Sequence, residues 1–268
     1  MAIITISRGS YSRGEEVAQK VAQKLGYECI SRDILLEASK EFNIPEIKLV
    51  RAIHDAPSAL GRFGYTKDKY ISFVEAAILK HFKQDNIVYC GLAGHFFVRG
   101  VSHVLKVRIL AEFGDRVASE MKREGLGEKE AAGLLRKDDE ERRKWSKNLY
   151  GIDTGDPSLY DLVIHIKKIG VEDAVGLICQ TAALKQFQTT PQSRKMVEDL
   201  ALAAEVRAAL VDLKPNIKVW ATDGSVRIHA RVDETRNMAV VGDMEKIAKS
   251  IDGVRDVTVE VRPKDPVD

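Results

Sequence analysis

The sequence predicts an α/β protein, a doubly wound parallel sheet of five strands followed by a second, smaller domain of the α+β class. Short apolar strands alternate with amphipathic helices through the N-terminal part of the chain, and a glycine-containing loop joins the first strand to the first helix. The C-terminal part changes to the order helix, strand, strand, helix, strand, or αββαβ. With 268 residues, 44% of them hydrophobic, the chain can bury a core in each domain.

The first strand and helix are joined by a loop that can bind phosphate. Residues 2–7 (AIITIS) form an apolar run, and residues 15–26 (EEVAQKVAQKLG) place apolar side chains on one helix face before a C-cap glycine. The loop between them, RGSYSRG, contains Gly9 and Gly14. Unpaired N–H groups at a helix start favour an anion, so phosphate is the expected occupant. A glycine loop in this position can also be only a tight turn, and the sequence leaves both interpretations open.

The following segments continue the alternation of strands and helices. Residues 27–30 predict a second strand, and residues 31–42 predict a helix capped by Ser31. Residues 44–84 indicate two helices around a loop, an insertion of the kind that often covers a substrate. The remaining strands of the first sheet are expected at residues 86–90, 104–110 and 162–166. Ligands of such a sheet bind at the carboxyl ends of its strands, and the glycine loop lies at one of these ends.

A polar stretch divides the chain into two predicted domains. Residues 188–195 (QTTPQSRK) are expected to link a first domain, residues 1–187, to a second domain, residues 196–262. Asp223-Gly224 stands between two strands of alternating pattern, which is a strong hairpin signal.

Composition narrows the functional classes. The chain has 42 basic and 40 acidic residues, so net charge gives no reason to expect nucleic-acid binding. The 3 cysteines and 6 histidines show no metal-ligand spacing, and no metal site is predicted. Neither a signal peptide nor an apolar run of membrane-spanning length is evident, which predicts a cytoplasmic protein without a membrane span.

Residues 136–144 (RKDDEERRK) lie on a predicted polar helix. Four of its cations stand at i, i+1, i+6 and i+7, namely Arg136, Lys137, Arg142 and Arg143. Arg136 and Arg143 therefore share a helix face, with Arg142 beside them, and the group can close over phosphates. The same spacing fits a solvated face with ion pairs from Asp138 to Arg142 and from Asp139 to Arg143.

Two resemblances go beyond these patterns. The segments ITISRGSYSRGEEVAQKVAQKLGYECISRDIL, NIVYCGLAG and LLRKDDEERRKWSKNLYGIDTGDPSLYDLVIHI together resemble the cytidylate kinase-like proteins, relatives of the nucleoside monophosphate kinases. This resemblance covers residues 1 to about 185. The hairpin pattern around DGSV and the later IDGVRDVTVEV make residues 196–262 similar to a BON domain. In that family the module usually binds a ligand or a partner, so a protein or small-ligand partner is expected there.

The kinase resemblance implies a P-loop core, an acceptor-binding region at residues 31–84 and an arginine-bearing lid at residues 136–150. It implies transfer of the ATP γ-phosphoryl group, with Mg²⁺ as cofactor, to a nucleotide substrate such as CMP. Arg32 and Asp33 occupy the place where the family holds the acceptor. The expected nucleotide- and phosphate-binding residues are Gly9, Ser10, Tyr11, Ser12, Arg13, Gly14, Glu15, Arg136 and Lys137. The expected catalytic cations are Arg13, Arg142 and Arg143.

The glycine loop departs from the Walker A pattern. That pattern is GxxxxGK followed by Ser or Thr, whereas Gly14 is followed here by Glu15 and Glu16. The phosphate-binding lysine and the Mg²⁺-binding hydroxyl are missing, and a carboxylate at Glu15 disfavours a triphosphate nearby.

The sequence therefore supports three hypotheses about the function of the protein. In the first, the protein is a nucleotide kinase in which Arg13 and the lid arginines replace the lysine. In the second, it is an inactive module that senses a nucleotide or phosphate and passes this state to a partner through the small domain. In the third, the small domain binds a ligand and the large domain is a scaffold. His95, which follows a strand end, is the histidine of most interest, although a structural role is the more common one for such a residue. Trp145 and Tyr150 can stack on a base, but core packing is the more common role of an aromatic residue on a helix.

Overall fold

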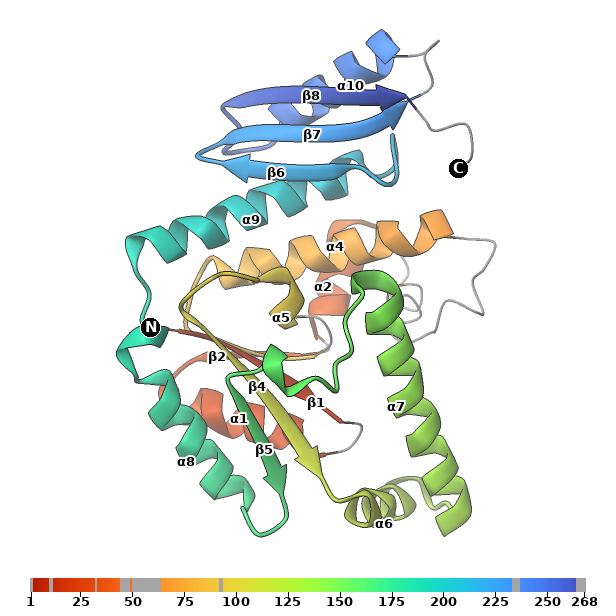
Figure 1. The fold of residues 1–268 in the computed structure, drawn as a ribbon, viewed down its shortest axis with the longest axis vertical. Helices are drawn as coiled ribbons and strands as arrows, with labels where there is room; N and C mark the ends of the chain where they lie inside the picture. Colours follow the sequence, from red (N-terminus) through yellow and green to blue (C-terminus); the bar gives the residue numbers. More distant parts are fainter. Residues whose placement is uncertain are drawn as a thin grey trace. The chain divides into compact units, whose positions relative to one another are not determined.

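The computed structural model describes residues 2–9, 12–31, 33–43, 49, 64–91, 94–232 and 237–263. The chain divides into two compact units, each with its own sheet (Figure 1). In the first unit the strand order is β2-β3-β1-β4-β5, and in the second it is β6-β7-β8.

The sheet of the first unit is parallel throughout, and it confirms the predicted doubly wound sheet of five strands. Its strands are β1 (Ile3–Arg8), β2 (Glu28–Ile30), β3 (Ile87–Cys90), β4 (Val104–Ala111) and β5 (Leu162–Ile166). Buried residues, most of them apolar, follow one another along β1 and β3 because the central strands of a parallel sheet are covered on both faces.

Helices cover this sheet and extend from its carboxyl edge. α1 (Gly14–Leu25) and α8 (Val171–Ala182) pack together on one face, where Val17, Val21 and Ile178 join the buried core. α6 (Phe113–Glu124) and α7 (Glu128–Tyr150) share a separate apolar cluster centred on Leu135. The other described helical segments of the first unit are the short α5 (Gly94–Phe97) and the 3₁₀ turns η2 (Pro157–Leu159) and η3 (Lys185–Phe187). α2 (Asp33–Glu41) falls largely within the second unit.

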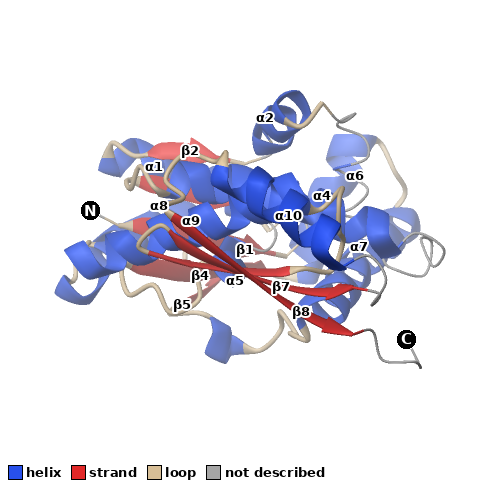
Figure 2. Cartoon of the chain, turned by 90° about the horizontal axis from the view of Figure 1, so that it is seen from above, coloured by secondary structure: helices blue, strands red, loops and turns tan. Residues whose placement is uncertain are grey.

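The second unit has the element order that the sequence predicts for the C-terminal part. The elements are α9 (Pro191–Leu210), β6 (Lys218–Thr222), β7 (Ser225–Val232), α10 (Asn237–Lys249) and β8 (Asp256–Pro263). Both helices contribute to one core on a single face of the sheet, with α10 seen beside β7 and β8 in Figure 2. Asp223 and Gly224 have φ values of 52° and 76°, the left-handed conformations that a type I′ hairpin needs.

The predicted domain limits differ from these units in two respects. α9 begins at Pro191, so residues 191–195 of the predicted linker are helical. α4 (Gly64–Phe82), from the middle of the sequence, packs along α9, and Glu75 pairs with Arg207 at 2.9 Å. Of the two helices expected at residues 44–84, the first falls largely on residues 44–48 and 50–63, which lie outside the described residues. The BON-like identity of residues 196–262 stays a prediction.

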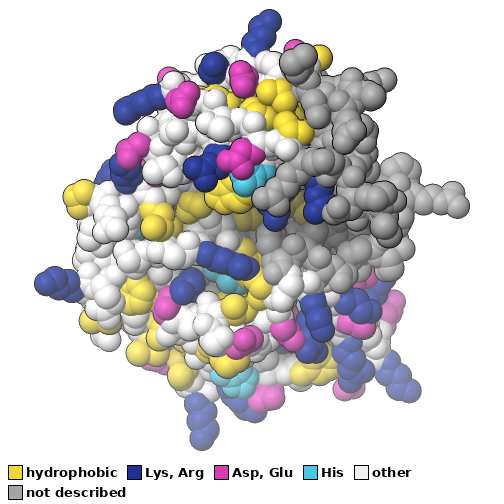
Figure 3. All heavy atoms as spheres, turned by 45° about the horizontal axis from the view of Figure 1, so that its top comes forward, with side chains coloured by type: hydrophobic (Ala, Val, Ile, Leu, Met, Phe, Trp, Pro, Cys, Tyr) yellow, Lys and Arg dark blue, Asp and Glu magenta, His cyan; other side chains and the backbone are white. Residues whose placement is uncertain are grey.

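Surface charge and the hydropathy of the helices are relevant to two predictions, that the protein binds no nucleic acid and that it has no membrane span. On the face drawn in Figure 3, basic and acidic side chains are interspersed rather than gathered into a patch of one sign. Within the described residues, no helix has both the length and the apolar character needed to cross a membrane. A cytoplasmic location stays a prediction.

The close approach of Gly14 to Arg8 gives a stability prediction. A Cβ atom on Gly14 would lie 2.8 Å from the Cβ of Arg8, and that atom cannot rotate away. Gly14→Ala should therefore lower the free energy of unfolding by about 1–3 kcal/mol, measured by urea denaturation. The matched control is Gly133→Ala in α7, where a Cβ meets nothing within 4 Å. Gly133→Ala should raise the free energy of unfolding by about 0.5–1 kcal/mol. Equal stability of the two variants would contradict the described packing of the loop.

Candidate functional site

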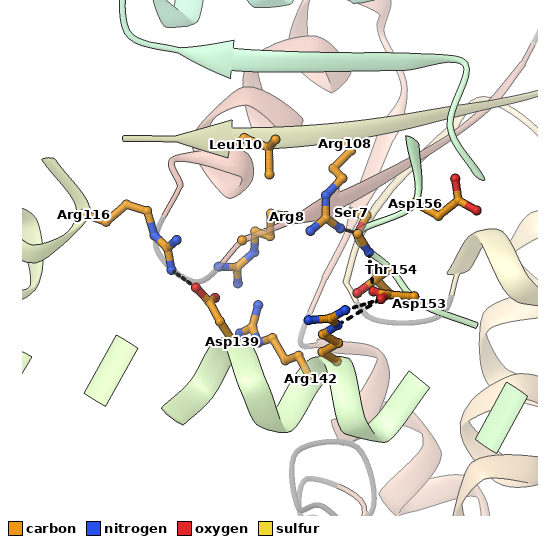
Figure 4. Close-up of a pocket in the computed structure, with 13 residues that line it drawn as sticks. Ser7, Arg8, Arg108, Leu110, Arg116, Asp139, Arg142, Asp153, Thr154 and Asp156 are labelled. Atoms are coloured by element: carbon orange, nitrogen blue, oxygen red, sulfur yellow. Dashed lines mark hydrogen bonds and ion pairs between the residues drawn. The ribbon is translucent and has the colours of Figure 1, made fainter. Parts of the chain in front are cut away.

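A cavity of about 620 Å³ opens at the carboxyl ends of β1 and β4, close to the glycine loop (Figure 4). The strands β1 and β4 supply Ser7, Arg8, Arg108 and Leu110, and the glycine loop supplies Gly9. The helices α6 and α7 supply Arg116, Asp139, Arg142 and Arg143, and the loop before η2 supplies residues 153–156. This is the edge of a doubly wound sheet at which ligands bind.

Arginine dominates the lining of the cavity. Among the described residues, five guanidinium groups line the cavity against three carboxylates: Arg8, Arg108, Arg116, Arg142 and Arg143 against Asp139, Asp153 and Asp156. Arg116 donates to Asp139 at 2.7 Å, and Arg143 donates to Asp153 at 2.6 Å. The excess of positive charge suits an anion, and planar guanidinium groups match the oxygens of a phosphate group.

The carboxylates of the loop before η2 are held in their charged form. The hydrogen bond from Arg143, followed by the one from the Gly155 N–H, lowers the pKa of Asp153. Hydrogen bonds from Ser158 lower the pKa of Asp156, whose Oδ1 accepts from the Ser158 N–H at 2.9 Å. Both groups are therefore anionic at neutral pH.

The glycine loop borders the cavity through Gly9, the described loop residue that lines it. The buried Ser12 hydroxyl lies 3.0 Å from the carbonyl oxygens of both Gly9 and Ile109, and the Ser12 N–H donates to the Gly9 carbonyl. The polar hydrogens of Ser12 are thus directed to the protein itself, and they tie the loop to the end of β4.

The charged residues of the loop form two separate pairs. Arg13, at φ 63°, donates to both carboxylate oxygens of Glu16, at 2.8 and 3.0 Å, and it does not line the cavity. Glu15 lies 3.6 Å from Arg8, the lining residue at the end of β1. The cation beside the position of the Walker lysine therefore comes from the strand.

The structure brings together three of the predicted site residues, which are Gly9, Arg142 and Arg143. Arg136 lies over the ring of Phe113 at 5.1 Å, and Lys137 is 4.0 Å from Glu141. Other residues of the predicted set that do not line the cavity are Ser12, Arg13, Gly14, Glu15 and Asp33. Ser10, Tyr11 and Arg32 lie outside the described residues, as do the side chains of Trp145 and Tyr150. The roles assigned to all these residues stay predictions.

Sequence reasoning missed three of the lining arginines. Arg108 could have been identified from the sequence, because a charged residue near the end of the apolar strand VLKVRIL needs polar partners at the edge of the sheet. Arg8 stands next to the glycine loop and was treated as part of it. Arg116 carried no signal, because it occurs in a polar helix yet is buried.

His95 packs against Tyr160 and does not line the cavity. Its ring centroid is 4.1 Å from that of Phe96 and 5.2 Å from that of Tyr160, and its buried Nε2 has no hydrogen-bond partner within the described residues. Burial lowers the pKa of His95 to about 3, and the charges of Arg108, Arg99 and Lys106 contribute. The imidazole is therefore neutral. In the described part of the chain, no group of three or more His, Cys, Asp or Glu side chains is arranged to hold a metal ion.

Comparisons of the sequence with known proteins identify a family for the first part of the chain. A sequence model described as the cytidylate kinase-like family matches residues 3–168, more than half of the chain. A cytidylate kinase of Archaeoglobus fulgidus is 30% identical over 190 residues, which cover 69% of this chain and 97% of that protein. A cytidylate kinase of Thermococcus kodakarensis is 31% identical over 96 residues, 36% of this chain and 49% of that protein, so this match spans about half of the relative.

One solved structure bears on the fold alone. An uncharacterized protein from Eubacterium ventriosum matches with a TM-score of 0.52 and 23% identity, covering 68% of this chain and 98% of that one.

The neutral state of His95 predicts a pH dependence of stability. The native pKa near 3 lies below the unfolded value near 6.5, so the unfolded chain binds the extra proton between these values. The stability from the neutral ring is complete above about pH 6.5 and is lost as the pH falls toward 3. Between about pH 6 and about pH 4, wild type should lose about 1 kcal/mol per pH unit more than His95→Phe in urea denaturation. His165→Phe, at an exposed residue of β5, should follow wild type. Parallel curves for wild type and His95→Phe would refute the buried neutral state.

Proposed function

Since the chain belongs to the cytidylate kinase-like family, we propose that it transfers the γ-phosphoryl group of ATP to a nucleoside monophosphate such as CMP. The observation that carries this proposal is the arginine-lined cavity at the carboxyl ends of β1 and β4. Phosphoryl transfer requires positioning of the reactants and positive charge around the transferring oxygens. The lining supplies both from a rigid sheet and from helix α7.

The cations approach the cavity from two sides. Arg8 and Arg108 extend from the strands, and Arg142 extends from α7 toward them (Figure 4). A polyphosphate between these groups would receive hydrogen bonds from both sides, and the surrounding side chains would exclude water from it. We assign the donor phosphates to this cavity.

Arg8 is the best candidate for the cation that the Walker pattern places after the second glycine. Its guanidinium lines the cavity and pairs with Glu15, whereas Arg13 is paired with Glu16 and does not line the cavity. We therefore give Arg8 the role that sequence spacing had suggested for Arg13, with Arg142 and Arg143 as the lid cations.

ATP and Mg²⁺ are the cofactors that this reaction requires. Mg²⁺ neutralises charge on the phosphate oxygens and usually needs only one or two protein carboxylates, because it keeps phosphate oxygens and water as its other ligands. Asp156 fits this need, since it lines the cavity and its pKa is held low by Ser158. The acceptor would occupy residues 31–84, so the choice of CMP rests on the family alone.

An assay of ADP formation with ATP, Mg²⁺ and a panel of nucleoside monophosphates tests this function. Wild type should form ADP in the presence of one preferred monophosphate. Arg142→Gln removes a lining cation, so kcat/KM should fall by about ten- to a hundredfold, the cost of a lost charge-assisted hydrogen bond. Lys144→Gln is the matched control on the same helix, because Lys144 pairs with Glu140 and does not line the cavity.

The outcomes of this assay separate the hypotheses. ATP binding without turnover would favour the inactive sensing module, and absence of both would refute a nucleotide function of the cavity. Equal losses of kcat/KM in Arg142→Gln and Lys144→Gln would show that the phosphate site does not lie at the residues that line the cavity.

The pairing of Glu15 with Arg8 gives a second prediction. Glu15→Gln removes a carboxylate that competes with phosphate for Arg8, so the Kd for ATP in calorimetry should fall by about two- to fivefold, the worth of an exposed ion pair. Glu16→Gln is the control, because Glu16 pairs with Arg13 outside the cavity. Equal effects of the two substitutions would show that general charge, rather than release of Arg8, controls the affinity.

A further inference from the structure

We propose that Tyr160 is a positioning residue of the cavity, which fixes the Arg108 guanidinium and the loop of residues 153–156 in a single arrangement. The inference rests on the proposed function in one respect, namely that the cavity binds phosphate groups. Tyr160 itself does not line the cavity, so it acts through its neighbours.

The Tyr160 hydroxyl contacts three residues of the lining. It lies 3.0 Å from Arg108 Nη1, 3.0 Å from the Thr154 carbonyl oxygen and 3.3 Å from Ser7 Oγ. A carbonyl oxygen only accepts and a guanidinium only donates, so the Tyr160 proton goes to Thr154 while its lone pairs accept from Arg108 and from the Ser7 hydroxyl. One hydroxyl thus satisfies all of its hydrogen-bonding capacity with groups of the cavity wall.

These three contacts join separate parts of the chain. Ser7 is on β1, Arg108 is its register partner on β4, and Thr154 belongs to the loop before η2. Within that loop the neighbouring Asp153 holds Arg143 of α7. Tyr160 therefore connects the cation on the strand with the loop that receives a cation of the helix.

Packing restrains the tyrosine ring itself. Tyr160 is only 9% exposed, its ring lies 5.4 Å from the Arg108 guanidinium carbon, and it also packs 5.2 Å from the His95 ring. A cation over an aromatic face is attracted to it, so the ring and the hydroxyl hold Arg108 together. A ring fixed in this way can orient the guanidinium before the ligand arrives, which lowers the ordering cost of binding.

A double-mutant cycle with Tyr160→Phe and Arg108→Gln tests this role, with inorganic tripolyphosphate as the calorimetric probe. Tyr160→Phe keeps the ring and removes the hydroxyl, so its Kd should rise about tenfold. In the Arg108→Gln background the same change should raise Kd by only about two- to threefold, because the contact with Arg108 is already gone and only the contact with the Thr154 carbonyl oxygen remains to be lost. Tyr27→Phe is the control, since that hydroxyl bonds to the Ala2 backbone away from the cavity.

A second variant guards against a general loss of structure. Ser7→Ala removes the hydroxyl that contacts both Tyr160 and Arg108 Nη1 and leaves the tyrosine ring in place, so it should raise Kd by a few fold, with a thermal midpoint like that of Tyr27→Phe. Tripolyphosphate binding by wild type with unchanged affinity in Tyr160→Phe would overturn this inference and leave the proposed function intact. Equal effects of Tyr160→Phe with and without Arg108 would also overturn it. Failure of wild type to bind tripolyphosphate or ATP would overturn the proposed function itself.

Discussion

The arginine side chains that line the cavity in the described part of the chain repel one another, and the architecture of this edge of the sheet depends on how that repulsion is offset. Each described pair joins different elements. Arg116 with Asp139 connects α6 to α7, Arg143 with Asp153 connects α7 to the loop before η2, and Arg8 with Glu15 connects β1 to α1. Arg108 is held instead by neutral oxygens of Tyr160 and Ser7. The cavity is thus built by the same contacts that hold its cations in place.

These pairs differ in how readily a ligand can replace them. The Arg116 side chain is 10% exposed, whereas that of Arg143 is 66% exposed. An exposed pair contributes at most about 1 kcal/mol, so Arg143 can leave Asp153 for a phosphate at little cost. Breaking a buried pair costs far more, because the charge left behind has no water around it. Arg116 is therefore a fixed part of the wall, and Arg143 is an adaptable one.

The fold was largely predictable because short apolar runs in the sequence report buried strands directly, as in residues 2–7 and 87–90. The cavity was only partly predictable, because its cations come from elements that lie far apart in the sequence. The register of the sheet sets Ser7 on β1 beside Arg108 on β4, and no local sequence pattern reports this register. Helix spacing grouped Arg136 with Arg142 and Arg143, whereas only Arg142 and Arg143 of these three line the cavity. Seven residues return to the same face about 10 Å further along the axis, which places Arg136 over Phe113 instead. The packing of α4 on α9 was likewise a long-range contact that composition shifts do not reveal.

The departure from the Walker pattern has a consistent physical explanation once Arg8 is considered. A lysine after Gly14 would bring its cation from the helix start, whereas here the cation comes from the strand before the loop. That route requires a residue without a side chain at position 14, since a Cβ there would lie 2.8 Å from Arg8 Cβ. Glu15 then acts as a counter-ion to Arg8 at 3.6 Å and reduces its repulsion with Arg108 across the neighbouring strands. In the proposed function, Gly14, Glu15 and Arg8 therefore act together. Arg8 on β1 supplies the positive charge for the phosphates, Glu15 is its counter-ion, and Gly14 leaves space for the Arg8 side chain.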